Sequence, residues 1–303
     1  MNLSRLTAVF ALSSLLSISL LSGQTPATPA ASNTPAPAAV ASTSTPPTPD
    51  PKILEDGGFY LEPVFWLTRG QPALFGGSAA TAYGNLTYPG KPRDGYGFEL
   101  GIPAGRANTI RLSAFRVLGH GDSTVGAVAQ GGSTIFSELY SPGDFIVASY
   151  TVESAKVSWD YLSYTFKNRI RFKTLYEMQF VTIGTSVSAP FAPLTYDAST
   201  GGNNPNSSTG SKNIFLPTFG VEFEQPVTKH LRWELKGSGF GIPHHSDIWD
   251  AQADIALRFS AFEVQVGGRA YHFKTAPGTD QYFTDTLDGA YVGIRYYLSK
   301  PTQ

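Results

Sequence analysis

The clearest pattern in the chain is an alternation of apolar and polar residues between Ile248 and Phe259. Odd positions from 249 to 259 hold Trp, Ala, Ala, Ile, Leu and Phe, and even positions from 250 to 258 hold Asp, Gln, Asp, Ala and Arg. Side chains of a β-strand alternate between faces, so this segment has one apolar and one charged face. It is also about long enough to cross a bilayer as a tilted strand. The pattern therefore predicts a transmembrane strand.

Similar alternation recurs in nine other segments. In most of them, charged or polar residues occupy one set of alternating positions and aliphatic or aromatic residues occupy the other. The alternation changes at Tyr161 and Leu162, where a β-bulge would explain the altered pattern. Besides 248–259, the expected strands are 59–68, 94–103, 109–118, 150–166, 170–185, 215–224, 231–236, 262–269 and 291–298.

The connections between these strands alternate in length. The expected long loops are 69–92, 119–143 and 189–213, and the expected short turns are 103–105, 167–169, 226–229 and 260–261. Outer-membrane barrels combine long extracellular loops, short periplasmic turns and an even number of strands. We therefore predict an all-β fold, a transmembrane antiparallel up-and-down β-barrel of about ten strands, with eight or twelve as alternatives.

The beginning of the chain has the pattern of a secretory signal peptide, residues 1–23. One positive charge at Arg5 precedes the apolar run from Leu6 to Leu21, and small residues follow at Ser22 and Gly23. The run is short for a helix that would stay in the membrane as an anchor. We therefore expect the protein to be exported.

The rest of the chain divides by composition into three further parts. Residues 24–56 are rich in Pro, Ala and Thr, and are expected to form a disordered linker, because such a segment cannot bury a core. Residues 57–299 hold the predicted outer-membrane barrel, and 300–303 form a C-terminal tail. With an even number of strands, the N-terminal tail is expected to be periplasmic.

Composition and charge limit the possible partners. The chain has 31 Gly, 15 Tyr and 20 Phe, which suits a sheet protein rich in turns and aromatic residues. Its formal net charge of −1 argues against a nucleic-acid partner. It contains no Cys, so no disulfide framework holds the fold. Lipid of the outer membrane is the expected environment, and the pattern does not indicate an oligomeric state.

Charged residues of both signs occupy the face predicted to line the lumen. A barrel of about ten strands has a narrow interior, in which buried charges must pair with one another or hold water. Two interpretations stay open: an ion-pair network that fills the lumen, or a thin polar channel with weak ion preference. The predicted lumen-lining residues are Glu62, Glu99, Arg111, Lys156, Asp160, Arg171, Lys173, Glu177, Glu222, Glu224, Arg232, Glu234, Lys236, Asp250, Asp254, Arg258, Glu263, Arg269 and Arg295.

A histidine-rich segment raises the alternative of an enzyme. His245 lies close in sequence to Asp247 and Asp250, at an expected extracellular turn. A histidine near carboxylates at a barrel rim would suit a surface hydrolase, either omptin-like or lipid-modifying. No serine motif at a convincing spacing accompanies it, so catalytic residues are not assigned and the protein is not expected to be an enzyme. The sequence also contains no motif for a metal or a cofactor.

The last strand carries a resemblance to a known family. Tyr291-Val292-Gly293-Ile294-Arg295-Tyr296-Tyr297-Leu298 resembles the C-terminal β-signal of outer-membrane proteins, although five more residues follow it here. The resemblance is to small Gram-negative outer-membrane barrels, porin-like, OmpW-like or OmpA-like, and implies recognition by the barrel assembly machinery. We therefore expect a structural barrel or a narrow passive pore for ions or small solutes. An adhesin acting through the long extracellular loops is a further alternative.

Overall fold

The computed structural model describes most of the predicted barrel and none of the predicted signal peptide. The described residues are 58–69, 73–76, 86–87, 93–105, 108–124, 133–135, 138–140, 143–166, 170–192, 195–197, 202–204, 207–228, 230–276 and 281–298. The predicted signal peptide, the linker and the C-terminal tail lie outside them, so these three assignments stay predictions. No helix in the described part of the chain is long and apolar enough to cross a membrane.

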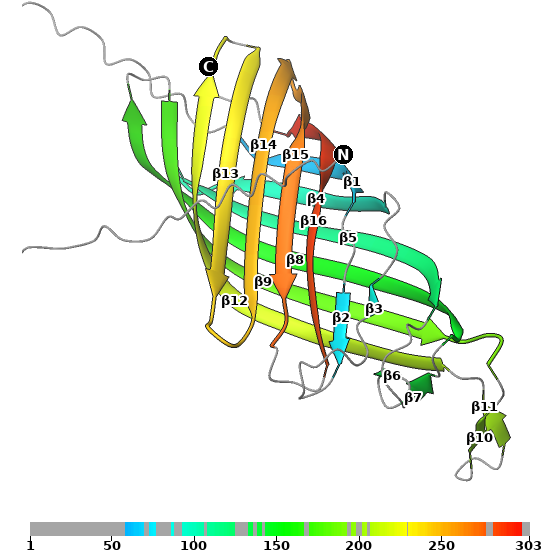
Figure 1. The fold of residues 1–303 in the computed structure, drawn as a ribbon. Helices are drawn as coiled ribbons and strands as arrows, with labels where there is room; N and C mark the ends of the chain where they lie inside the picture. Colours follow the sequence, from blue (N-terminus) through cyan, green and yellow to red (C-terminus); the bar gives the residue numbers. More distant parts are fainter. Residues whose placement is uncertain are drawn as a thin grey trace, which may run out of the picture. The chain divides into compact units, whose positions relative to one another are not determined.

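Ten antiparallel strands form a closed barrel, in which each strand pairs with its neighbour along the chain and β16 pairs with β1 (Figure 1). This confirms the predicted fold class and strand number. The ten strands are β1 (Tyr60–Thr68), β4 (Arg93–Pro103), β5 (Thr109–Thr124), β8 (Phe145–Phe166), β9 (Ile170–Ser188), β12 (Ser207–Pro226), β13 (Leu231–Gly241), β14 (Asp247–Phe259), β15 (Phe262–Lys274) and β16 (Gln281–Tyr297).

Six short strands lie in the connections. β2 (Ala73–Gly76) pairs with the start of β16 and with β3 (Leu86–Thr87), while β6 (Ser133–Ile135) pairs with β7 (Glu138–Tyr140), and β10 (Thr195–Asp197) pairs with β11 (Gly202–Asn204). All six belong to connections at one end of the barrel, here called the long-loop end. The other end, where β16 finishes, is called the short-turn end.

β8, β9 and β12 are the longest strands of the barrel, and β5, which pairs with β8, extends with them at the long-loop end. β5, β8, β9 and β12 have 16, 22, 19 and 20 residues, whereas β1 has 9 and β13 has 11. β12 pairs with β9 along residues 207–224 but with β13 only from Phe219 onward. The long strands therefore extend past the other strands at the long-loop end (Figure 1). We call this extension, residues 118–124, 145–153, 182–188 and 207–213, the wall.

The wall corrects part of the sequence prediction. Residues 119–124 and 207–213 were expected in loops, but they belong to β5 and β12. The segment from Ser207 to Asn213 has polar or glycine residues at every position and so lacks the alternation that marks a strand. Its strand conformation follows from backbone pairing with β9. The bulge expected near Tyr161 is present, because the register of β8 against β9 shifts between Leu162 and Tyr164.

The alternation of apolar and polar residues inverts part of the way along the long strands. On β8, Val157 and Trp159 point outward and are about half exposed, while Ser158 and Asp160 are buried inside. From Glu153 to Ser149, toward the long-loop end, the outward residues are polar and the apolar residues Val152 and Tyr150 point inward and are buried. A membrane barrel needs apolar residues outside where it meets lipid, and a part standing in water needs them inside. The inversion therefore marks the membrane surface.

The outer face of the barrel carries an apolar belt, which all ten strands form together. Large exposed hydrophobic residues cover the outer face on every strand of the barrel, among them Phe98, Phe219 and Ile255. Toward the long-loop end, the outward positions become polar or charged at nearly the same level. These first polar outward residues are Arg69, Asp94, Arg116, Glu153, Thr182, Asn213, Asp247, His272 and Asp288. We infer that the belt spans the membrane and that the wall stands outside it.

Candidate functional site

Among the described residues, the largest group of charged side chains lies in the interior of the barrel. All 19 residues predicted to line the lumen lie on the inward face of their strands, and 14 of them are buried. They gather in the half of the interior near the short-turn end. We call this set the charged layer. Whether its residues line a passage for solutes stays a prediction.

Arg111 lies at the centre of the charged layer. Its guanidinium group lies 2.5 Å from Asp160, 2.8 Å from Glu222 and 3.5 Å from Glu99, and its side chain is 7% exposed. Lys173 contacts the second oxygen of Glu222 at 2.9 Å. Five strands thus meet in one ion-pair network, because β4, β5, β8, β9 and β12 each contribute a member.

A second group of pairs closes the barrel near the short-turn end. Arg295 on β16 donates to Glu62 on β1 at 2.7 Å and lies 3.6 Å from Glu263 on β15. Arg232 on β13 also bonds Glu263, and it lies 3.3 Å from Glu224. The pair of Arg295 and Glu62 spans the seam between the first and last strands, so side chains as well as backbone bonds hold the closure.

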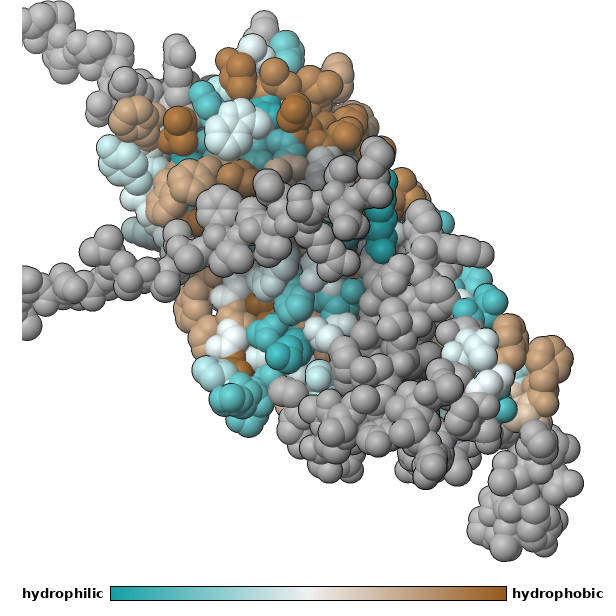
Figure 2. Space-filling model, in the orientation of Figure 1, coloured by the Kyte–Doolittle hydropathy of each residue, from teal (hydrophilic) through white to brown (hydrophobic). Residues whose placement is uncertain are grey.

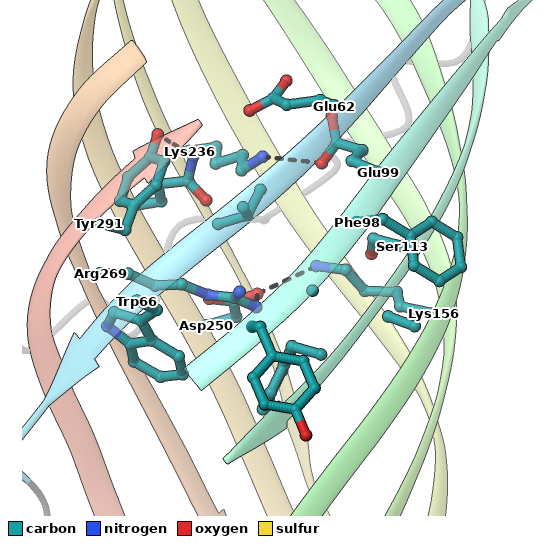
Figure 3. A pocket seen from close by; sticks show the side chains of 16 residues that line it. Glu62, Trp66, Phe98, Glu99, Ser113, Lys156, Lys236, Asp250, Arg269 and Tyr291 are labelled. Carbon is teal, nitrogen blue, oxygen red and sulfur yellow. Dashed lines mark hydrogen bonds and ion pairs between the residues drawn. The ribbon is translucent and has the colours of Figure 1, made fainter. Parts of the chain in front are cut away.

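Asp250 lies at the edge of the charged layer that faces the long-loop end. It accepts two hydrogen bonds from Arg269, at 2.9 and 2.8 Å, and one from Lys156 at 3.1 Å. Figure 3 shows these three side chains pointing toward one another from different strands. The guanidinium of Arg269 also lies over the rings of Phe115 and Trp66, at 4.6 and 5.1 Å from their centroids. A cation that stacks on aromatic faces can join a charged layer to an apolar one.

An apolar layer fills the other half of the interior. The rings of Phe115 and Tyr271 pack edge to face at 4.9 Å, and Tyr140 of β7 enters from a connection and hydrogen-bonds the carbonyl of Val187. The buried members of this layer are Trp66, Phe115, Val117, Tyr140, Ile146, Ala148, Tyr150, Val152, Val181, Ile183, Val187, Ala189, Ile214, Leu216, Ile248, Tyr271, Phe273, Phe283, Leu287 and Tyr291.

The apolar layer is absent from the sequence prediction. Only the charged positions defined the predicted inward face, and the same alternating positions continue into the wall as apolar residues. On β9 the inward odd positions run from Arg171 and Lys173 to Val181 and Ile183, while the outward even positions become Thr182 and Gly184. The change from charged to apolar residues at the odd positions of β9 could therefore have been found in the sequence.

The space left between the two layers is small. A cavity of about 40 Å³ lies beside Lys156, Lys236, Asp250 and Arg269 (Figure 3). Such a volume holds on the order of a few water molecules. Asp160, Glu222, Tyr271 and Phe273 on the inward face are each 0% exposed. Side chains along a water-filled passage would be wetted, so these four positions do not border one.

The residues proposed for a rim hydrolase are not brought together. Asp250 faces the interior and is held by Arg269 and Lys156. Asp247 lies 3.0 Å from the Nε2 atom of His272 on the neighbouring strand. His245 is exposed in the turn after β13, where its backbone N–H donates to the carbonyl of Ile242. The structure thus places the two carboxylates on opposite faces of β14, each with another partner.

His272 joins a short row of side chains on the outer face. Its ring stacks on Trp249 at 5.5 Å, and its Nδ1 atom lies 2.9 Å from the hydroxyl of Thr286. Aromatic and polar residues that stack across strands are usual at the edge of a membrane belt. The row thus accounts for His272 as a structural residue. Among the residues the structure describes, no group of three or more His, Asp or Glu could hold a metal ion.

Comparison with solved structures agrees with this architecture. The outer membrane protease OmpT from Escherichia coli matches with a TM-score of 0.52 at 8% identity, over 80% of this chain and 97% of that one. The chain has the fold of the outer-membrane β-barrels. At this identity the likeness concerns the fold alone.

Other matches to solved barrels are weaker. Ail, the attachment invasion locus protein of Yersinia pestis, matches with a TM-score of 0.34 at 8% identity, over 80% of this chain and all of that one. The toluene transporter TodX of Pseudomonas putida matches with a TM-score of 0.31 at 8% identity, over 81% and 91% of the two chains. No protein-family model and no curated protein matches the sequence.

Proposed function

We propose that the protein is a sealed barrel of the Gram-negative outer membrane that holds the wall on the cell surface. In this proposal the short-turn end faces the periplasm, where the predicted linker also lies. The barrel is a scaffold, and the surface that acts on the surroundings is the wall with the connections beside it.

The filled interior carries this proposal. The charged layer pairs its acids and bases, and the apolar layer consists of side chains that are at most 9% exposed. Charges in a narrow space of low dielectric are retained only when they are paired. A structural barrel whose lumen is filled by ion pairs, one of the two interpretations of the sequence, therefore has more support than a narrow passive pore.

The wall supports a role outside the cell. β8 alone extends nine residues past the belt, which is about 30 Å of strand. Near its far end, the rings of Phe145 and Phe191 lie 5.6 Å apart, and Phe191 is 81% exposed. Figure 2 shows a group of hydrophobic residues at that end of the long strands. Exposed aromatic residues on a water-facing surface suit contact with a partner, so the adhesin alternative would use this wall.

Assembly of the barrel in the membrane extends the proposal. β16 closes the barrel against β1, and its residues Tyr291–Leu298 carry the resemblance to the C-terminal β-signal. We propose that the barrel assembly machinery recognises this strand before it pairs with β1. A rim hydrolase has less support, because Asp247 and Asp250 are bound to residues other than His245.

A conductance measurement tests the sealed barrel. We expect the purified full chain to produce no channel events in planar lipid bilayers, because in this proposal the two layers fill the interior. Each preparation is first shown to be folded, by its faster migration on a gel when it is not boiled. Channel events of constant size from protein that passes this check would contradict the proposal and restore the pore.

A labelling experiment tests which end lies outside the cell. The chain has no Cys, so a single introduced cysteine has no background. We expect Ser149→Cys in the wall to react with a membrane-impermeant maleimide on intact cells. Thr228→Cys, in the exposed turn between β12 and β13, should react only after the outer membrane is opened. The reverse pattern would show that the wall faces the periplasm, which would also exclude the adhesin alternative.

A further inference from the structure

The outer face of the barrel has a groove of about 490 Å³ over β4, β5, β8 and β9. Its floor and sides come from one row of directly paired residues, Phe98, Ala114, Ala155 and Phe180. Neighbouring strands lie about 4.8 Å apart, so the two Phe residues stand about 14 Å apart on either side of two small residues. Both rings are about half exposed, so they rise above the alanine floor.

A polar row lies next to this groove on the long-loop side. It consists of Tyr96, Arg116, Glu153 and Thr182, which are again paired across the same four strands. The Nε atom of Arg116 lies 3.0 Å from Glu153, and the two side chains are 48% and 49% exposed. These residues are at the level where the outer face becomes polar on the other strands. The groove therefore begins directly beneath the membrane surface.

The opposite side of the groove continues into the apolar belt. The next row toward the short-turn end is Leu100, Leu112, Val157 and Met178, all of them apolar. A chain that enters below the polar row can thus follow the strands toward the middle of the bilayer without meeting a polar group. Of the rows from these four strands described here, only the one with Ala114 and Ala155 combines two small residues with two large flanking ones.

We propose that this groove binds an acyl chain of an outer-leaflet lipid whose headgroup phosphate is bound by Arg116. A guanidinium group presents its donors in a planar fork that matches a phosphate, and the contact of Arg116 with Glu153 engages the Nε atom. Glu153 orients the group, and the terminal amino groups of Arg116 meet the phosphate. The ligand class is an acylated lipid that carries a phosphate in its headgroup.

The shape of the groove favours a lipid over a second copy of this chain. A second copy of this chain would have to insert side chains of its own apolar belt between the raised rings of Phe98 and Phe180 to reach Ala114 and Ala155. A flexible alkyl chain can lie between them. Lipid tails are as apolar as the groove, so burial alone adds little, and selectivity must come from packing and from the phosphate contact.

Native mass spectrometry of the full chain in detergent can test this site. The probes are dipalmitoyl phosphatidic acid and the matching dipalmitoylglycerol, which lacks the phosphate. We expect the phosphatidic acid to bind about tenfold more tightly, the effect of a charge-assisted hydrogen bond. Ala155→Phe fills the floor and should weaken both lipids about tenfold. Ala253→Phe, at an exposed alanine in the belt on β14, is the matched control and should bind both lipids like the wild type.

A second variant separates the phosphate contact from the groove. Arg116→Gln should lower binding of the phosphatidic acid to the level of dipalmitoylglycerol and leave the neutral lipid unchanged. The proposal is wrong if Ala155→Phe binds like the wild type, if Ala253→Phe loses as much, or if Arg116→Gln keeps the preference. A dimer that Ala155→Phe abolishes would assign the groove to a second copy instead. All variants are first shown to be folded by heat-modifiable migration on a gel.

Discussion

Arg111→Met is expected to lower the free energy of unfolding by about 3–5 kcal/mol, because it removes a buried cation that three buried carboxylates share. Arg111 lies against Asp160, Glu222 and Glu99 inside the barrel, where water cannot replace it. The measurement is equilibrium unfolding in guanidinium chloride of protein refolded into phospholipid vesicles, followed by tryptophan fluorescence.

Arg116→Met is the matched control for this variant. Arg116 lies on the same strand and also forms an ion pair, but its partner Glu153 and its own side chain are about half exposed. An exposed pair contributes about 0–1 kcal/mol, so this variant should lose much less than Arg111→Met. A double variant, Arg111→Met with Glu222→Gln, should recover part of the loss, because it removes one of the negative charges left in excess in the charged layer. Equal losses for Arg111→Met and Arg116→Met would show that the charged layer does not stabilise the barrel.

Ile255→Arg is expected to destabilise the protein in lipid by about 2–4 kcal/mol, the cost of an arginine near the middle of the bilayer. Ile255 points outward from β14, is 56% exposed and lies between Trp249 and Phe259 within the apolar belt. The same unfolding measurement in vesicles gives the difference.

Ser211→Arg provides the control for the membrane boundary. Ser211 also points outward, but it lies in the wall, where the outer face is polar. Its replacement should change the free energy of unfolding by no more than about 0.5 kcal/mol, as is usual for surface positions. A neutral Ile255→Arg, or an equal loss for Ser211→Arg, would mean that the belt does not mark the position of the bilayer.

The strands within the membrane could be predicted from local pattern. In β14 every residue from Trp249 to Phe259 except the inward Ala256 shows its face by its class, because lipid on one side and a closed interior on the other impose opposite chemistry. The start of β12 could not be predicted in this way. From Ser207 to Asn213 both faces hold small or polar residues, and only pairing with β9 makes this segment a strand.

The charged layer could also be predicted only in part. The alternating pattern predicts which charged residues point inward, because they occupy the polar positions of amphipathic strands. Examples are Arg111, Glu222, Glu62 and Arg295. Their pairing does not follow, because Arg111 meets Glu222 across 111 positions and Arg295 meets Glu62 across 233. Such contacts depend on how closure of the barrel brings distant strands to one level.

The alternating pattern from Ile248 to Phe259 was sufficient to establish a membrane strand and, with its repeats, a barrel, because a strand shows both of its environments in consecutive residues. Whether the interior is open or filled depends on side chains that come from all ten strands, and on Tyr140 from a connection. The sequence gives the size of each of these side chains. How they fill the interior together is decided only by the tertiary structure, because closure of the barrel brings them into contact.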